Sequence, residues 1–226
     1  MFHPREFKAA LKVSVPVMMG YLVLGFAFGL LAVSSGFKWY IAIIMSLIIY
    51  AGALQFLAIG LLSLKSGYLD IFIASIMVNI RQSFYGLSLL KKFKKVIFKP
   101  YLIFALTDET YALLTTIKEP DSLKKKWYYL YLSALNQSYW VTGTTLGAIF
   151  GLSVSFNTKG LDFSLTALFV VLAIEQYKKI KNYFPFLLGA VASLLGLVLV
   201  PRENMLLVSI LLSLVAMFIF SKKFEK

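Results

Sequence analysis

Three ionisable residues lie inside apolar stretches of this sequence that are long enough to enter a membrane. Arg81 lies within residues 68–90, and Asp108 and Glu109 lie within residues 100–117. A charge near the centre of a bilayer costs from roughly 3 to above 10 kcal/mol, so such groups persist where they pair, face water or bind something. The sequence therefore predicts a membrane protein with a polar site at depth.

The two carboxylates are expected to have different roles. Neighbouring residues diverge by about 100° around a helix, so Asp108 and Glu109 face different surroundings. One of them can pair with Arg81 and stay ionised, while the other, at low dielectric, favours its neutral form and can carry a proton. We expect Glu109 to be the proton carrier because its longer side chain can swing between a pocket and water, with Asp108 as the second candidate. A purely structural Arg–carboxylate bridge is the alternative.

Further polar residues in the neighbouring apolar stretches are candidates to line the same site. Gln55 follows Tyr50-Ala-Gly-Ala-Leu, a small-residue run that predicts either tight packing or a local break of the helix. A zwitterionic ligand needs a cation for its carboxylate and an anion for its ammonium group, and Arg81 with Asp108 or Glu109 offers that pair. For Gln55 and Trp140, ordinary helix packing is an equally good interpretation. The predicted substrate-binding residues are Arg81, Asp108, Gln55, Asn79, Asn136 and Trp140.

Composition restricts the class of protein. The 226 residues are 60% hydrophobic and 15% charged, with a net charge of +13. The bases lie in short loops and at the termini, as in membrane proteins whose cytoplasmic loops contact anionic lipid, so nucleic acid is a poorer partner. The chain has no Cys and one His. Disulfides are excluded, and no metal site or cofactor is expected.

The apolar stretches predict an all-α, polytopic bundle of seven or eight transmembrane helices, forming a single transport domain over residues 1–226. A span needs about 20 residues, so several stretches are short. The stretches are Val13–Ser35, Ile41–Leu64, Tyr68–Leu90, Pro100–Ile117, Trp127–Leu152, Leu161–Tyr177, Phe184–Val200 and Met205–Phe220.

The distribution of Lys and Arg predicts that both termini are cytoplasmic. Eight spans place the basic amino terminus, residues 118–126, residues 178–181 and the carboxyl tail on one side. The lysine-rich loop at residues 91–99 violates this arrangement, because it falls on the other side. Either the charge rule is overridden there, or one of the charged segments, the third or the fourth, re-enters the membrane.

Glycines in two stretches are spaced four residues apart, which predicts close helix packing. Gly25-Phe-Ala-Phe-Gly29-Leu in the first stretch also matches Gly147-Ala-Ile-Phe-Gly151-Leu in the fifth. Internal repeats are common in transporters, so the match is consistent with an internal repeat.

Taken in order, these motifs resemble the AzlC-type branched-chain amino acid permeases, the large subunit of the AzlC–AzlD exporters. Gln82 departs from the family pattern, which often has His after the Arg. The matching residues are Pro16, Gly20, Gly25 and Gly29; Tyr50-Ala-Gly-Ala-Leu-Gln-Phe56; Asn79-Ile-Arg81 with Tyr85-Gly86; Asp108-Glu109-Thr110; Asn136, Trp140, Gly143 and Gly147; and Gly160-Leu-Asp-Phe-Ser164 with Phe169.

The resemblance implies a secondary transporter in the cell membrane that exports branched-chain or other apolar amino acids and is driven by protons. It also implies a small, AzlD-like membrane subunit as partner.

Two rival functions remain from the residues alone. Paired carboxylates can do acid–base chemistry in a membrane-embedded enzyme, and a non-transporting accessory subunit is the other. We expect no enzyme, because the sequence holds no catalytic His or Cys cluster.

Overall fold

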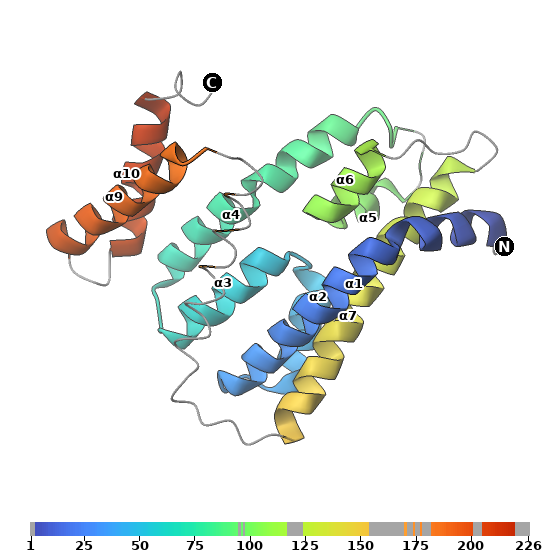
Figure 1. Ribbon diagram of the computed structural model, residues 1–226, viewed down its shortest axis with the longest axis horizontal. Coiled ribbons are helices and arrows are strands. Elements are labelled where there is room, and N and C mark those ends of the chain that lie inside the picture. The colour runs from blue at the N-terminus through green and yellow to red at the C-terminus, as the bar shows by residue number, and fades with distance from the viewer. Residues whose placement is uncertain are drawn as a thin grey trace. The chain divides into compact units, whose positions relative to one another are not determined.

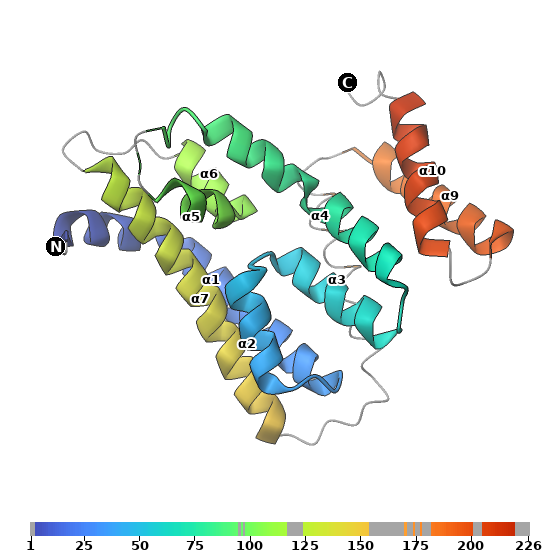
Figure 2. The ribbon, with the colours of Figure 1, turned by 180° about the vertical axis from the view of Figure 1, so that it is seen from behind.

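The computed structural model describes residues 3–94, 96, 98–116, 124–153, 170, 174, 177, 182–200 and 205–219. Within these residues, every regular element is an α-helix (Figures 1 and 2), which confirms the all-α prediction. The helices are α1 (Pro4–Ser34), α2 (Trp39–Ile48), α3 (Gly52–Ser63), α4 (Tyr68–Leu89), α5 (Lys99–Phe104), α6 (Asp108–Thr116), α7 (Lys125–Ser153), α9 (Phe184–Leu199) and α10 (Met205–Ile219).

The chain divides into two compact units, Met1–Ile59 with Val78–Thr158, and Gly60–Met77 with Lys159–Lys226. The first unit contains every charged residue of the predicted site. In the second, α9 and α10 pack on one another, and Gly196 lies against Ser209. The sixth predicted stretch falls almost entirely outside the described residues. A single transport domain stays a prediction.

Helices α1 and α7 form the frame of the first unit and run side by side in both views (Figures 1 and 2). Their glycines let the two backbones touch. A Cβ added at Gly25 would come within 2.7 Å of the Trp140 carbonyl, and one at Gly143 within 2.6 Å of the Leu22 carbonyl. The close helix packing predicted from the glycine spacing is therefore confirmed.

The predicted span Ile41–Leu64 is not one continuous helix. The chain breaks between α2 and α3, where Tyr50 takes a left-handed φ of 44°. The Gln55 amide then donates to Ser46 Oγ at 3.0 Å. Nine residues of straight helix would separate these positions by about 13 Å, so the chain folds back into what we call the first hairpin. Of the two alternatives predicted for the small-residue run at Tyr50, the local break of the helix is confirmed.

The predicted span Pro100–Ile117 is also broken, between α5 and α6. Tyr101 of α5 and Thr110 of α6 bond to adjacent residues of α7, Gln137 and Asn136. The two short helices therefore lie at the same level of the frame and form the second hairpin. Of the two charged segments suspected of re-entry, this one is broken, whereas α4 is continuous.

The ends of the second hairpin lie together, beside the amino-terminal ends of α1 and α7. Lys92 Nζ donates to the Leu114 carbonyl near the end of α6, at 2.6 Å. Phe93 is fully buried in a cluster that also holds Ala10 of α1 and Tyr128 of α7. The chain path thus has the reversal that re-entry requires. It also brings residues 91–94 to the end of the frame where the amino terminus lies.

Among the described helices, α1 is long and apolar enough to cross a membrane by length and composition. Helix α4 has 22 residues and α7 has 29, which is also enough length for a span of about 20 residues. Helices α2, α3, α5 and α6 are each too short to cross alone. Their contribution is to bring polar backbone and side chains to the middle of the frame.

Candidate functional site

Arg81 of α4 and Asp108 of α6 form an ion pair, with Nη1 3.0 Å from Oδ2. Their side chains are 40% and 26% exposed, so the pair is only partly covered. Tyr85, one helical turn after Arg81, lies beside both charges and stacks on Tyr111 at 4.2 Å between ring centroids. Arg81 thus joins Asp108 in the structure, and Glu109 has another partner.

The ion pair leaves one polar atom of each residue unused. Arg81 Nε and Asp108 Oδ1 are shielded from water and have no hydrogen-bond partner among the described residues. A buried polar atom without a partner costs about 1–3 kcal/mol, and more when it belongs to a charged group. Such atoms need an explanation, and a bound molecule with its own donor and acceptor would supply it.

Glu109 bonds to the frame instead. The Tyr21 hydroxyl of α1 lies 2.6 Å from Glu109 Oε2 and also 2.6 Å from Thr107 Oγ1. Tyr21 is 5% exposed, whereas Glu109 is exposed. One carboxylate therefore pairs with a cation, and the adjacent carboxylate rests on a buried tyrosine while remaining open to its surroundings.

The start of α6 explains why two acids can follow one another here. Thr107 caps the helix, since its Oγ1 accepts a hydrogen bond from the Thr110 N–H at 3.3 Å. Asp108 and Glu109 then lie in the first turn. The amino-terminal end of a helix carries a partial positive charge that stabilises anions. The break in the chain thus places both carboxylates where their negative charge is tolerated.

The tips of the two hairpins meet beside Glu109. Tyr50, in the turn of the first hairpin, lies near Glu109 and Thr110, and its ring is 6.2 Å from that of Phe104. Tyr50 is 2% exposed, and its hydroxyl has no hydrogen-bond partner among the described residues. A left-handed φ is rare for a bulky residue and clusters at functional sites.

Gln55 and Trp140 lie in a separate chain of hydrogen bonds that ties the first hairpin to α7. Trp140 Nε1 donates to Gln55 Oε1 at 3.0 Å, and the Gln55 amide donates to Ser46. Ser46 in turn bonds Thr144 at 2.9 Å. Both ends of the Gln55 amide are thus used internally. The Tyr21 ring packs edge-on against Trp140 at 5.4 Å, which places this chain next to the Glu109 network.

The other two predicted residues differ. Asn136 is fully buried and donates to Thr110 Oγ1 at 3.0 Å, while its carbonyl oxygen has no partner among the described residues. Asn79 is half-buried on α4, and no described hydrogen bond joins it to the site. The structure therefore brings Arg81, Asp108, Glu109, Gln55, Asn136 and Trp140 into connected networks and leaves Asn79 apart.

Sequence reasoning missed Tyr21, and it left the polar residues Thr107 and Gln137 out of the predicted site. A threonine directly before an Asp-Glu pair is a recognisable helix start, so Thr107 could have been found. One tyrosine in an apolar helix carries no such signal. Gln137 accepts a hydrogen bond from Tyr101 and donates to the Leu47 carbonyl, a group left over at the end of α2.

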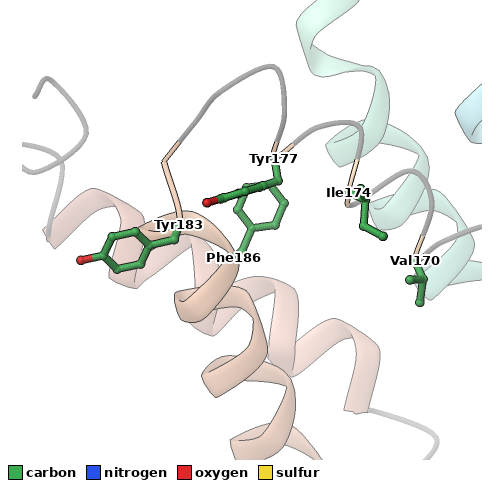
Figure 3. Close-up of a pocket in the computed structure, with 5 residues that line it drawn as sticks. All are labelled: Val170, Ile174, Tyr177, Tyr183 and Phe186. Carbon is green, nitrogen blue, oxygen red and sulfur yellow. The ribbon is translucent and has the colours of Figure 1, made fainter.

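The second unit contains an apolar depression, unlike the charged site of the first unit. Figure 3 shows an open apolar depression in which Tyr177 and Phe186 lie together, with ring centroids 5.7 Å apart. Its other lining residues are Val170, Ile174 and Tyr183. None of these side chains is charged, so the depression cannot neutralise the head group of an ionic ligand. Across the described residues, no group of His, Cys, Asp and Glu could hold a metal ion.

Comparison with known proteins places this site in a family. The family model described as AzlC protein matches residues 16–154, which include both hairpins and the whole site. No solved structure matches the chain.

Several curated proteins are similar to most of the chain. The branched-chain amino acid transport protein AzlC of Bacillus subtilis is 37% identical over 221 residues, covering 97% of this chain and 87% of that protein. An uncharacterised membrane protein of Helicobacter pylori is 40% identical over 222 residues, covering 98% and 97%. The inner membrane protein YgaZ of Escherichia coli is 31% identical over 201 residues, covering 82% and 80%.

Proposed function

The chain belongs to the AzlC family of membrane transport proteins, and on that premise we propose that it exports branched-chain or other apolar amino acids in exchange for protons. Family members are named as transport proteins, and the chain is not an enzyme. The Bacillus subtilis relative is named for branched-chain amino acids, and that name supports the choice of substrate.

The observation that carries the proposal is the partly covered Arg81–Asp108 pair with its two unused atoms. A zwitterionic amino acid has a carboxylate that accepts hydrogen bonds and an ammonium group that donates them. The carboxylate fits Arg81 Nε, and the ammonium group fits Asp108 Oδ1, both of which lack partners among the described residues. Substrate would thus relieve the two unsatisfied groups, which gives the binding step its driving force.

Glu109 is proposed as the proton carrier. It does not pair with Arg81 in the structure, and its side chain is exposed while its carboxylate touches the buried Tyr21. A group that must load and release protons needs both an open path and a partner inside the protein. Asp108, held by a cation, is the poorer candidate for this task.

The proposed membrane arrangement follows from the hairpins. The first hairpin follows the carboxyl end of α1, and the second lies at the amino-terminal end of the frame. We place the two hairpins as re-entrant segments from opposite sides, with their tips and the site between them near the bilayer midplane. Both termini and residues 91–94 then lie in the cytoplasm, in agreement with the charge rule. A small AzlD-like membrane subunit is the proposed partner.

Vesicle transport tests the function directly. Purified chain is reconstituted with and without the product of a co-encoded small membrane protein, and vesicles are loaded with labelled leucine, valine or glutamate. We expect saturable efflux of leucine and valine that accelerates when protons are more concentrated outside, and no efflux of glutamate. Equal rates in protein-free vesicles, or non-saturating flux that ignores the pH gradient, would remove the proposal in favour of a scaffold or a channel.

A further inference from the structure

Tyr21 lies at the junction of the proton site and the start of α6. Its hydroxyl oxygen is 2.6 Å from Glu109 Oε2 and 2.6 Å from Thr107 Oγ1. A phenol has one proton to donate, so Tyr21 can donate to only one of these two acceptors at a time. The choice between them depends on whether Glu109 carries a proton.

We propose that Tyr21 is a positioning residue that transmits the proton state of Glu109 to the capping residue of α6, and through α6 to the Arg81–Asp108 pair. This inference rests on the proposed role of Glu109 as proton carrier. It assigns coupling to a residue that touches neither the amino acid nor the ion pair.

The hydrogen bonds define the two states. When Glu109 is ionised, its Oε2 accepts the Tyr21 proton, because a charged acceptor forms the stronger bond. When Glu109 takes up a proton, that proton bonds to the Tyr21 oxygen, and Tyr21 turns its own proton to Thr107 Oγ1. Thr107 then donates onward to Thr110 Oγ1, 3.0 Å away. No proton leaves the network in this step, and only the bonds change direction.

Thr107 connects this change to the substrate side of the site. Its Oγ1 already accepts the Thr110 N–H that begins α6, at 3.3 Å. A hydroxyl oxygen can accept two hydrogen bonds, so the bond from Tyr21 adds to the one from the Thr110 N–H and pulls on Thr107, the residue directly before Asp108. A shift of the first turn of α6 therefore moves the Asp108 carboxylate relative to Arg81, which lies on a different helix.

No other charged group among the described residues takes over this role. Among the described residues, the side-chain hydrogen bond to the Glu109 carboxylate comes from Tyr21. The groups that the structure places beside Glu109 are Tyr21 from α1 and Tyr50 from the turn of the first hairpin. The groups around these are Tyr101 of α5 near Tyr50, Asn136 of α7 on Thr110, Trp140 of α7 on Tyr21, and the adjacent Asp108 with its partner Arg81 of α4.

Trp140 provides a readout that does not depend on transport. Its ring lies edge-on to that of Tyr21 at 5.4 Å, and the chain has three tryptophans. With Trp39→Phe and Trp127→Phe, Trp140 becomes the single tryptophan, and excitation at the red edge of the absorption band selects it over the tyrosines. We expect its emission in detergent, without substrate, to change with pH in this background and not in the same background with Glu109→Gln.

The decisive variant is Tyr21→Phe, with Tyr50→Phe as the matched control. Both tyrosines are buried beside Glu109, but only Tyr21 has a described hydrogen bond to it. We expect Tyr21→Phe to lose the pH-dependent change of Trp140 emission and Tyr50→Phe to keep it. In vesicles, Tyr21→Phe should lose gradient-driven efflux and keep substrate exchange. Thr107→Ser should keep coupling, and Thr107→Val should lose it.

A purely structural role of Tyr21 would shift the emission at every pH and leave its pH-dependent part intact, which would overturn the inference. A pH response that survives Glu109→Gln would also overturn it, because another group would then be titrating. The proposed function fails in a different way: the unaltered chain would show no amino acid flux although the Trp140 response and its dependence on Tyr21 were present.

Discussion

The α1–α7 frame and the two hairpin tips differ in how their helices meet. In the frame, glycines bring two long helices into backbone contact. At the tips, the helices stop, and tyrosine, threonine and carboxylate side chains fill the space between them. The distance between α1 and α7 can change little, because their backbones are already in close contact. The tips hold polar groups whose bonds can be exchanged, which suits them to binding and release.

The largest effect is expected where the frame itself is broken. Gly147→Val places side-chain atoms against the backbone of Phe26, so α1 and α7 must separate. We expect a loss of stability of about 3 kcal/mol or more, at the upper end for overpacked cores. Gly20→Val is the control, because nothing lies within 4 Å of a Cβ built at Gly20. Thermal unfolding in detergent checks both, and equal melting temperatures would contradict the account of the frame.

A smaller structural effect and a large functional one are expected at the ion pair. Arg81→Ala should abolish transport and leave Asp108 without its cation. Arg81→Lys should restore little activity, because lysine lacks the planar fork of donors with which arginine binds carboxylates bidentately. Efflux at matched expression measures both variants. Normal efflux by Arg81→Ala would show that the site lies elsewhere.

The two adjacent carboxylates should separate in function. Glu109→Gln is expected to lose gradient-driven efflux and to keep exchange of labelled for unlabelled substrate. Asp108→Asn is expected to lose both activities, since it removes the partner of Arg81. Counterflow assays with and without a pH gradient distinguish the outcomes. If both variants respond normally to the gradient, neither residue carries the proton.

The smallest effect on activity is expected from substitutions that only report position. The chain has no Cys, so single cysteines can be labelled from either side of intact cells. Lys91→Cys and Lys94→Cys should react only from the cytoplasm, and Lys38→Cys only from outside. Lys92 is left unchanged because it bonds the Leu114 carbonyl. Labelling of positions 91 and 94 from outside would restore a full crossing in place of the second hairpin.

Composition and spacing were enough to predict the helical class, the glycine contacts and the distinct surroundings of the two acids. Arg81 and Asp108 were predicted because a charge in an apolar stretch demands a partner. The reversals at Tyr50 and Thr107 were harder, since a broken hairpin and a continuous span have the same hydropathy. Tyr21 was not predictable, because its role depends on a contact between residues far apart in the chain.

The side chain of Gln137 on α7 is hydrogen-bonded to both hairpins, which links their movements. Its side-chain oxygen accepts a hydrogen bond from the Tyr101 hydroxyl of the second hairpin at 2.8 Å. Its amide nitrogen donates one to the Leu47 carbonyl of the first hairpin at 3.1 Å. A single amide on α7 is therefore the shared pivot of both hairpins. Neither tip can swing away from α7 without dragging its counterpart or detaching from that amide. In the carrier that we propose, a movement of one hairpin would therefore be transmitted to the other through this amide.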